Sequence, residues 1–108
     1  EITNRWTTLG STSQNDWYAV NFGQPKEVSV IKLYLFADNK TYGVPESISV
    51  EYEAGGKWLP AKWKEQPPAA LIGNTVNTLL LEKITAAAIR INFKHNTKQV
   101  AVSEVECY

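Results

Sequence analysis

The alternation of apolar and polar positions predicts β-strands along nearly the whole chain. In residues 47–53, apolar side chains alternate with serines and glutamates, which is typical of a strand with one solvated face. Residues 28–36 are apolar in both phases except at Ser29 and Lys32, which predicts a central strand covered on both sides. Four further β-rich runs share this pattern: residues 16–22, 74–82, 89–94 and 100–108.

Glycines and prolines divide these runs at short intervals, as in a sandwich or barrel. No convincing amphipathic helix is found, because the alanines of "EKITAAAIR" lead directly into a β-branched alternation and predict the entry to a strand. The chain is therefore predicted to be all-β, an antiparallel β-sandwich with long loops at its ends. The predicted turns are "GQPKE", "YGVPE", "EAGGK" and "KEQPPAALIGN".

Length and charge restrict the function further. The 108 residues suit a single domain, and the 11 basic residues equal the 11 acidic ones, so nucleic acid is not expected as a partner. No apolar run reaches the roughly 20 residues of a membrane span, and residues 1–5 do not resemble a signal peptide. The abrupt start suggests a piece excised from a longer polypeptide. Cys107 is the only cysteine, so no internal disulfide is expected and a small buried hydrophobe is its expected role.

Five motifs occur in an order that resembles the discoidin-like, coagulation factor 5/8 type C family. Within that family the chain looks most similar to the family 32 carbohydrate-binding modules appended to bacterial glycoside hydrolases. The resemblance implies a jelly-roll sandwich of the galactose-binding type. The motifs are Arg5-Trp6, residues 17–23, Gly56-Lys57-Trp58, Ile89-Arg90-Ile91 and residues 103–108.

The chain departs from this family at its start, where a further strand and an Asp-Gly-Asn-like turn usually precede the Arg-Trp pair. Residues 1–108 are therefore expected to form one domain that lacks the usual leading strand. In the family, that turn and the first glutamate of the closing motif hold a structural calcium. Glu104 matches this glutamate, whereas Thr3 and Asn4 only border the missing turn.

The residues give an independent argument about Glu104. It shares the strand phase of Val100 and Val102, so in the absence of a bulge its side chain would point toward the core. A buried carboxylate requires a cation or strong hydrogen-bond donors. Calcium or the guanidinium of Arg5 would satisfy it, and the sequence leaves both alternatives open.

The supply of catalytic groups is poor. The chain has one histidine, one cysteine and two aspartates, and it lacks a Gly-x-Ser-x-Gly elbow, a zinc ligand set and a glycine-rich phosphate cradle. A glycosidase-type pair of carboxylates is set by distance in space, so spacing alone does not exclude it. Most of the glutamates, such as Glu51, Glu53, Glu65 and Glu82, nevertheless fall on predicted strand faces and turns, which is typical of solvated charge. The domain itself is predicted to be non-catalytic.

Three loops offer the mixed chemistry that sugar recognition requires. An aromatic ring stacks on the apolar side of a pyranose, while amides, acids and bases bond its hydroxyl groups. The resemblance implies, loop by loop, that these connections surround the ligand in sugar-binding relatives. The predicted ligand-binding residues are Asp38, Asn39, Lys40, Tyr42, His95, Asn96 and Lys98, and the loop before Trp17 adds Ser11, Thr12, Ser13, Gln14 and Asn15.

Each of these residues also has a structural alternative. Tyr42 could pack over the end of the sandwich, and His95 could be a satisfied edge residue because it continues the phase of Phe93. Asp38 and Asn39 could bond to their own backbone as turn formers. The tryptophans are predicted to pack in the core or, for Trp63, at a sandwich edge: Trp6, Trp17, Trp58 and Trp63.

The combined interpretation is a carbohydrate-binding module of a secreted, periplasmic or cell-surface bacterial glycan-degrading enzyme. Its expected partners are a carbohydrate and the catalytic domain of the parent polypeptide, and it is expected to be monomeric. The first alternative is a structural sandwich that packs against its parent enzyme and binds nothing. The second is a membrane or protein adhesion domain, for which the loops "ADNKTYGVP" and "KHNTKQ" are too polar.

Overall fold

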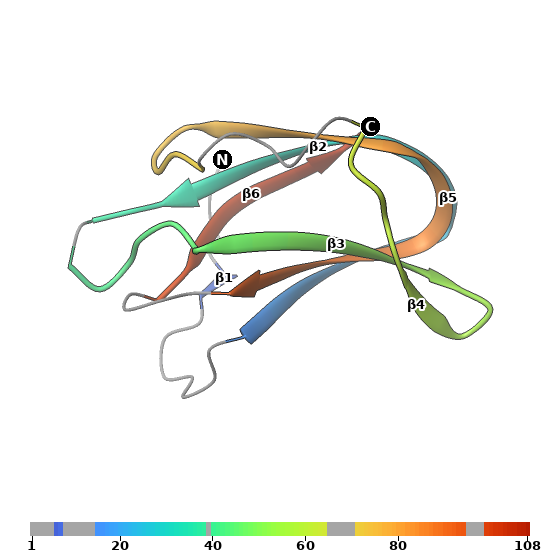
Figure 1. The fold of residues 1–108 in the computed structure, drawn as a ribbon, viewed down its shortest axis with the longest axis horizontal. Coiled ribbons are helices and arrows are strands. Elements are labelled where there is room, and N and C mark those ends of the chain that lie inside the picture. The colour runs from blue at the N-terminus through green and yellow to red at the C-terminus, as the bar shows by residue number, and fades with distance from the viewer. Residues whose placement is uncertain (1–5, 8–14, 39, 65–70, 95–98) are drawn as a thin grey trace.

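Antiparallel strands account for nearly all the regular structure. The computed structural model describes residues 6–7, 15–38, 40–64, 71–94 and 99–108. The sheet has the strand order β1-β6-β2-β5-β3-β4, and every pair of neighbours is antiparallel. The strands in these ranges are β1 (Trp6–Thr7), β2 (Asn15–Phe36), β3 (Ser47–Ala54), β4 (Lys57–Pro60), β5 (Val76–Lys94) and β6 (Ala101–Cys107) (Figure 1).

Two long strands, β2 and β5, bend and contribute to both layers of a sandwich. Layer A contains β1, β6, residues 26–36 of β2 and residues 76–86 of β5. Layer B contains residues 15–21 of β2, residues 88–94 of β5, β3 and β4. Figure 1 shows β5 curving from one layer to the other at the right of the view. The prediction of an all-β antiparallel sandwich is confirmed.

The segment "GQPKE" does not separate two strands, contrary to the prediction. β2 continues through it with an irregular register between Asn21 and Lys26. Gly23 takes a positive φ of 82°, which a residue without a Cβ adopts easily, and its N–H bonds to Oδ1 of Asn21 at 2.8 Å. The glycine and proline of this stretch therefore mark the bend of one strand.

The core lies between the two layers. Inward side chains of layer A and layer B are almost wholly excluded from solvent, as strict alternation along each strand requires. The bends allow one continuous sheet to bury its own inner face. The fully buried side chains of layer A include Ile31, Leu33, Leu35, Leu79 and Leu81, and those of layer B include Val50, Ile89, Ile91 and Phe93.

The outer face of layer A corrects one expectation about residues 28–36. Lys32 is exposed and lies opposite Thr78 on β5, while Tyr34 and Phe36 are only half-buried. A sandwich has two layers, so each strand has one core face and the other face meets solvent. The segment is thus covered on one side, although its outward positions carry apolar residues.

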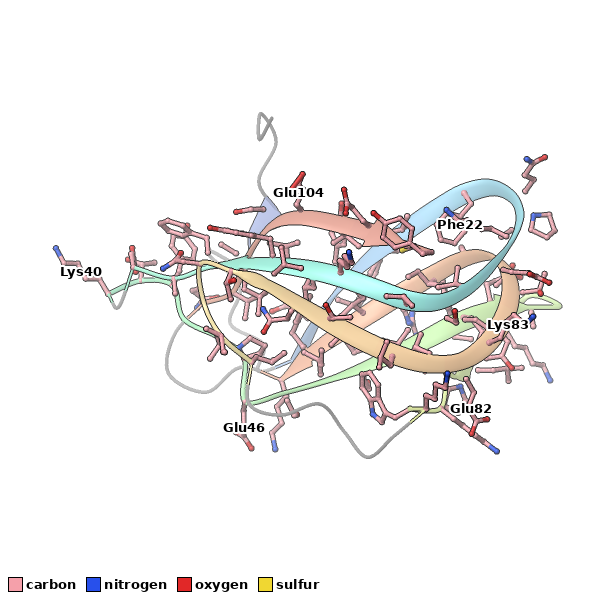
Figure 2. All side chains as sticks on the ribbon, turned by 90° about the horizontal axis from the view of Figure 1, so that it is seen from above. Phe22, Lys40, Glu46, Glu82, Lys83 and Glu104 are labelled. Atoms are coloured by element: carbon pink, nitrogen blue, oxygen red, sulfur yellow. The ribbon has the colours of Figure 1, made fainter. Side chains whose placement is uncertain are left out.

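A bulge in β6 reverses the predicted direction of Glu104. Tyr34 pairs with Glu104, but the next residue, Leu35, pairs with Val102, which leaves Ser103 as the extra residue. Val102 and Ser103 are therefore both buried, and Glu104 is exposed. Figure 2 shows Glu104 projecting away from the sandwich. The expectation that this carboxylate faces the core is wrong, because it assumed an uninterrupted alternation.

Asn74 joins the loop before β5 to the end of β2. Its side-chain amide exchanges two hydrogen bonds with the backbone of Ala37, at 3.0 and 2.9 Å, as a neighbouring strand would. Asn74 itself adopts a φ of 60°, and its N–H bonds to the carbonyl of Leu35 at 2.6 Å. Gly73 lies so close that a Cβ added to it would be 2.6 Å from the Cβ of Ala37. The loop is thereby held against the strand from which residues 38–46 depart.

We expect Gly73→Ala to lower the free energy of unfolding by about 1–3 kcal/mol, because the added methyl meets a rigid neighbour. Denaturant unfolding followed by tryptophan fluorescence measures the change. Ala37→Gly removes the opposing methyl. Adding Gly73→Ala to Ala37→Gly should therefore lower the free energy of unfolding by less than adding it to the wild type. If Gly73→Ala unfolds as the wild type does, the two segments are not held at this distance.

Candidate functional site

The loop that follows β2 meets the segment that precedes β6 at one end of the sandwich. The N–H of Gln99 bonds to the carbonyl of Thr41 at 2.9 Å, and the N–H of Gly43 bonds to the carbonyl of Gln99 at 3.0 Å. Tyr42 and Gln99 form a short parallel bridge. Two of the three predicted ligand loops are therefore connected to each other through Gln99.

Several predicted site residues cannot be placed. The positions concerned all lie outside the described residues, so their predicted roles stay predictions. The candidate site is accordingly described from the residues of these loops within the described ranges. They are Asn39, His95, Asn96 and Lys98, together with Ser11, Thr12, Ser13 and Gln14 of the loop before Trp17.

Asp38 organises its own loop. Its Oδ1 accepts the N–H groups of Lys40 at 2.8 Å and Tyr42 at 2.9 Å, and its own N–H bonds to the carbonyl of Tyr42 at 3.2 Å. The bond from the Tyr42 N–H, followed by that from Lys40, lowers the pKa of the Asp38 carboxyl below its usual value. This is the turn-forming role that the sequence offered as the alternative to ligand contact.

Tyr42 and Lys40 differ in their exposure. The ring of Tyr42 packs edge-on against Phe36, with centroids 5.9 Å apart and planes at 64°, and is half-buried. The sugar-binding hypothesis expected a ring exposed to solvent. The half-buried ring instead agrees in large part with the alternative, in which Tyr42 packs over the end of the sandwich. Lys40 is exposed and lies at the extreme end of the molecule in Figure 2, opposite the end that carries Glu82 and Lys83.

The sequence missed an aromatic and charged cluster on the outer face of layer B. Trp17, predicted to pack in the core, is 54% exposed. The guanidinium of Arg90 lies 5.8 Å from the centroid of the Trp17 ring and 4.5 Å from that of Trp58, which is half-buried. Strand phase would have indicated that Trp17 points outward, because it is out of phase with Tyr18 and Val20, which pack against the core.

Trp63 behaves as predicted. It forms a bridge with Leu81 of β5 and packs, half-buried, against the core cluster. The neighbouring backbone bonds run from the N–H of Lys64 to the carbonyl of Leu80 at 3.0 Å and from the N–H of Glu82 to the carbonyl of Lys62 at 2.9 Å. Its ring therefore closes the β5 edge of layer A and offers no open platform.

Arg90 also holds the carboxylate of Glu51, which lies directly opposite it in the register of β3 and β5. The Nε of Arg90 donates to Oε1 of Glu51 at 2.7 Å, and the Nδ2 of Asn92 donates to the same oxygen at 3.0 Å. The bond from Arg90, and then that from Asn92, holds the pKa of Glu51 below its usual value of 4.5. The carboxylate therefore stays ionised and acts as an acceptor rather than as a general acid at neutral pH.

The prediction of a calcium ligand at Glu104 gains no support from the part of the chain that is described. No group of three or more histidine, cysteine, aspartate or glutamate side chains there could hold a metal ion. Glu104 is exposed on the outer face of layer A, and Thr3, Asn4 and Arg5 lie outside the described ranges. Calcium binding therefore stays a prediction.

None of the described elements is a helix long and apolar enough to cross a membrane.

We expect the carboxyl group of Glu51 to titrate below pH 4.5 in the folded protein and to move upward in Arg90→Gln, because that variant removes the charged donor. Since the folded pKa is depressed, the ion pair stabilises the fold above the unfolded pKa. That stability is lost as the pH falls through the folded pKa. Side-chain carboxyl NMR measures both midpoints. Equal midpoints in the two proteins would show that the pair is not formed in solution.

Comparison with known proteins identifies relatives of this fold. The F5/8 type C domain family matches residues 1–106. A structure of the Streptococcus pneumoniae β-galactosidase BgaA superposes with a TM-score of 0.86 at 21% identity, covering 97% of this chain and 75% of that chain. No curated protein matches at a significant level.

Two carbohydrate-binding modules are also similar. The family 32 module of C. perfringens NanJ, solved in complex with galactose, has a TM-score of 0.77 at 19% identity and covers 99% of this chain and 77% of that chain. Chitosan-binding module 1 of a chitosanase/glucanase from Paenibacillus sp. IK-5 has a TM-score of 0.72 at 19% identity, covering 98% and 76%. These likenesses confirm the fold, and the family match over nearly the whole length shows that the chain belongs to the F5/8 type C domain family.

Proposed function

We propose that this domain is a non-catalytic carbohydrate-binding module of a secreted or cell-surface bacterial enzyme that degrades glycans. The observation that carries the proposal is the match to the F5/8 type C family together with the similarity to a module solved with galactose. The fold alone does not fix a ligand. The proposal therefore also depends on the chemistry of the loop end, by which we mean Asp38, residues 40–43 and Gln99 at one end of the sandwich.

The loop end is suited to a sugar because it is shaped before any ligand arrives. Asp38 fixes the turn through two backbone bonds, and Gln99 joins this loop to the neighbouring segment. Ordering a loop in advance lowers the entropic cost of binding. Lys40 then presents a charged donor at the exposed tip, and the polar edge of Tyr42 lies two residues away. These residues would bond to the hydroxyl groups of one terminal sugar.

A weak site of this kind is useful when it is attached to an enzyme. Binding one part of a polysaccharide raises the effective concentration of the rest near a tethered catalytic domain. The module needs no reactive group for this purpose. The parent enzyme, its secretion and its glycan are parts of the proposal.

The rival function, a sandwich that packs against its parent, would favour an apolar outer face. The outer face of layer A does expose Val76 and Leu80, at 51% and 41%. However, the exposed Lys32 and Thr78 lie between them in the register. An exposed lysine and a polar threonine through the middle make this face a poor counterpart of a buried interface, because interface centres are depleted in charged residues. The carbohydrate function is therefore preferred.

We expect galactose to shift the backbone amides of Asp38, Lys40 and Tyr42 saturably in an NMR titration at millimolar ligand. Lys40→Ala should weaken binding roughly tenfold, since a hydrogen bond from a charged donor contributes about 1.5–3 kcal/mol. Lys83→Ala is the matched control, because Lys83 is an exposed lysine at the opposite end of the molecule. An absence of shifts with galactose, chitosan and pectin oligosaccharides would favour the structural accessory role.

A further inference from the structure

The outer face of layer B carries a row of sugar-compatible side chains beside the loop end. Trp17 on β2, Asn92 on β5 and Ser49 on β3 lie opposite one another in register, on three neighbouring strands. Alternation places all three on the solvent side, because Phe93 and Ile91 on the same stretch of β5 face the core. An indole, an amide and a hydroxyl group thus lie together on rigid strands. Nδ2 of Asn92 donates to Oε1 of Glu51 at 3.0 Å and to Oγ of Ser49 at 3.5 Å, so Asn92 offers its Oδ1 and Ser49 its hydroxyl hydrogen to a ligand.

A hollow of about 200 Å³ lies in this face. The serines of β3, Ser47 and Ser49, leave space that larger residues would fill. We assign the hollow to the outer side of the sheet because four of its six lining residues, Ser47, Ser49, Asn92 and Lys94, lie in the outward phase of β3 and β5. It is lined by Ser47, Ile48, Ser49, Asn92, Phe93 and Lys94.

The charges around the hollow are compensated. Nζ of Lys94 lies 3.6 Å from Oε2 of Glu46, and Nε of Arg90 lies 2.7 Å from Oε1 of Glu51. Each cation therefore has its own carboxylate close by. A surface of this kind favours an uncharged, hydroxyl-rich ligand over a polyanion or a polycation, which would have to displace one partner of each pair.

Trp17 is held in position and remains accessible. Arg90 lies against its ring and is itself fixed by Trp58 and Glu51. A side chain that is already oriented loses little entropy when a ligand stacks on it. With 54% of its surface exposed, Trp17 retains an apolar area for the C–H side of a pyranose.

The hollow lies next to the point where the loop that carries Asp38 and Lys40 enters β3. The N–H of Glu46 bonds to the carbonyl of Lys94 at 2.7 Å, so the chain that leaves the loop of residues 38–45 enters β3 beside the last residue of β5. Lys94 and Asn92 are two residues apart on a strand, a distance of about 7 Å. An oligosaccharide anchored at the loop tip could therefore extend over this edge onto the sheet.

We propose that the outer face of layer B forms a second contact surface for a neutral oligosaccharide, with Trp17 stacking on one sugar and Asn92 and Ser49 bonding its hydroxyl groups. This inference rests on the proposed carbohydrate-binding function and extends its site beyond the loops. The surface makes longer chains bind more tightly than a single sugar.

The test compares galactose with a β-1,4-linked galactotetraose in NMR titrations of the intact chain. The tetraose should shift the indole N–H signal of Trp17 and the amides of Ser49 and Asn92, and galactose should shift only the loop amides. Trp17→Ala should weaken tetraose binding about tenfold and leave galactose binding unchanged. Val76→Ala is the matched control, because it removes a similarly exposed apolar side chain from the opposite layer.

A second variant guards against misfolding of Trp17→Ala. Ser49→Gln places a longer side chain over the hollow at an exposed position and should also weaken the tetraose selectively. Loop shifts without any change at Trp17, Ser49 or Asn92 would overturn the sheet surface while the proposed function stands. Shifts at the sheet alone would support this surface and contradict the loop site, and no shift with either sugar would overturn both. If charged oligosaccharides of chitosan or pectin bound to the sheet more tightly than the neutral tetraose, the inferred preference for neutral chains would be wrong.

Discussion

The structure depends on the bending of β2 and β5. Each strand is long enough to belong to both layers, so residues on one side of a single sheet, such as Leu33 and Ile91, belong to the same buried cluster. Hydrophobic burial is obtained without a helix or a second independent sheet among the described elements. Because the core uses only the inward phase of each strand, the outward phase and the strand-connecting loops are available for recognition.

The outward phase of layer B shows what this freedom allows. Arg90 lies at the centre of the face, where it contacts Trp17 and Trp58 and bonds to Glu51. A guanidinium suits this position because its plane stacks on aromatic rings while its edge bonds to a carboxylate, which a lysine ammonium cannot reproduce. The cluster stabilises the face and also holds Trp17 ready for a ligand, so structural and binding roles are compatible in the same residues.

Sequence alone predicted the sandwich and all six of the strand regions it proposed, because alternation and turn residues are local signals, and the order of five motifs indicated the family by resemblance. It failed where a single residue altered the phase or a distant partner determined exposure. Ser103 is an extra residue in β6, and nothing in "VAVSEVE" distinguishes such a bulge from regular alternation, so Glu104 was placed on the wrong side. Trp17 was assigned to the core on its residue type, although its phase relative to Tyr18 pointed outward. In the loop after β2, composition identified Asp38 as a candidate. It did not show whether the carboxylate binds a ligand or caps the turn, because that depends on the backbone geometry.

In the proposed site, a sheet face and a loop end would contribute to recognition in different ways. Loops can be exchanged without disturbing the core, so the residues at their tips, such as Lys40, are suited to selecting a terminal sugar. Strands hold Trp17 and Asn92 at a fixed spacing, which suits the repeating units of a chain. A ligand that engages both surfaces makes its second contact within the same complex, so two weak contacts give a stronger and more length-dependent association than either alone. The proposed parent enzyme would gain from that dependence, since a module of this kind would release short products and retain long substrates.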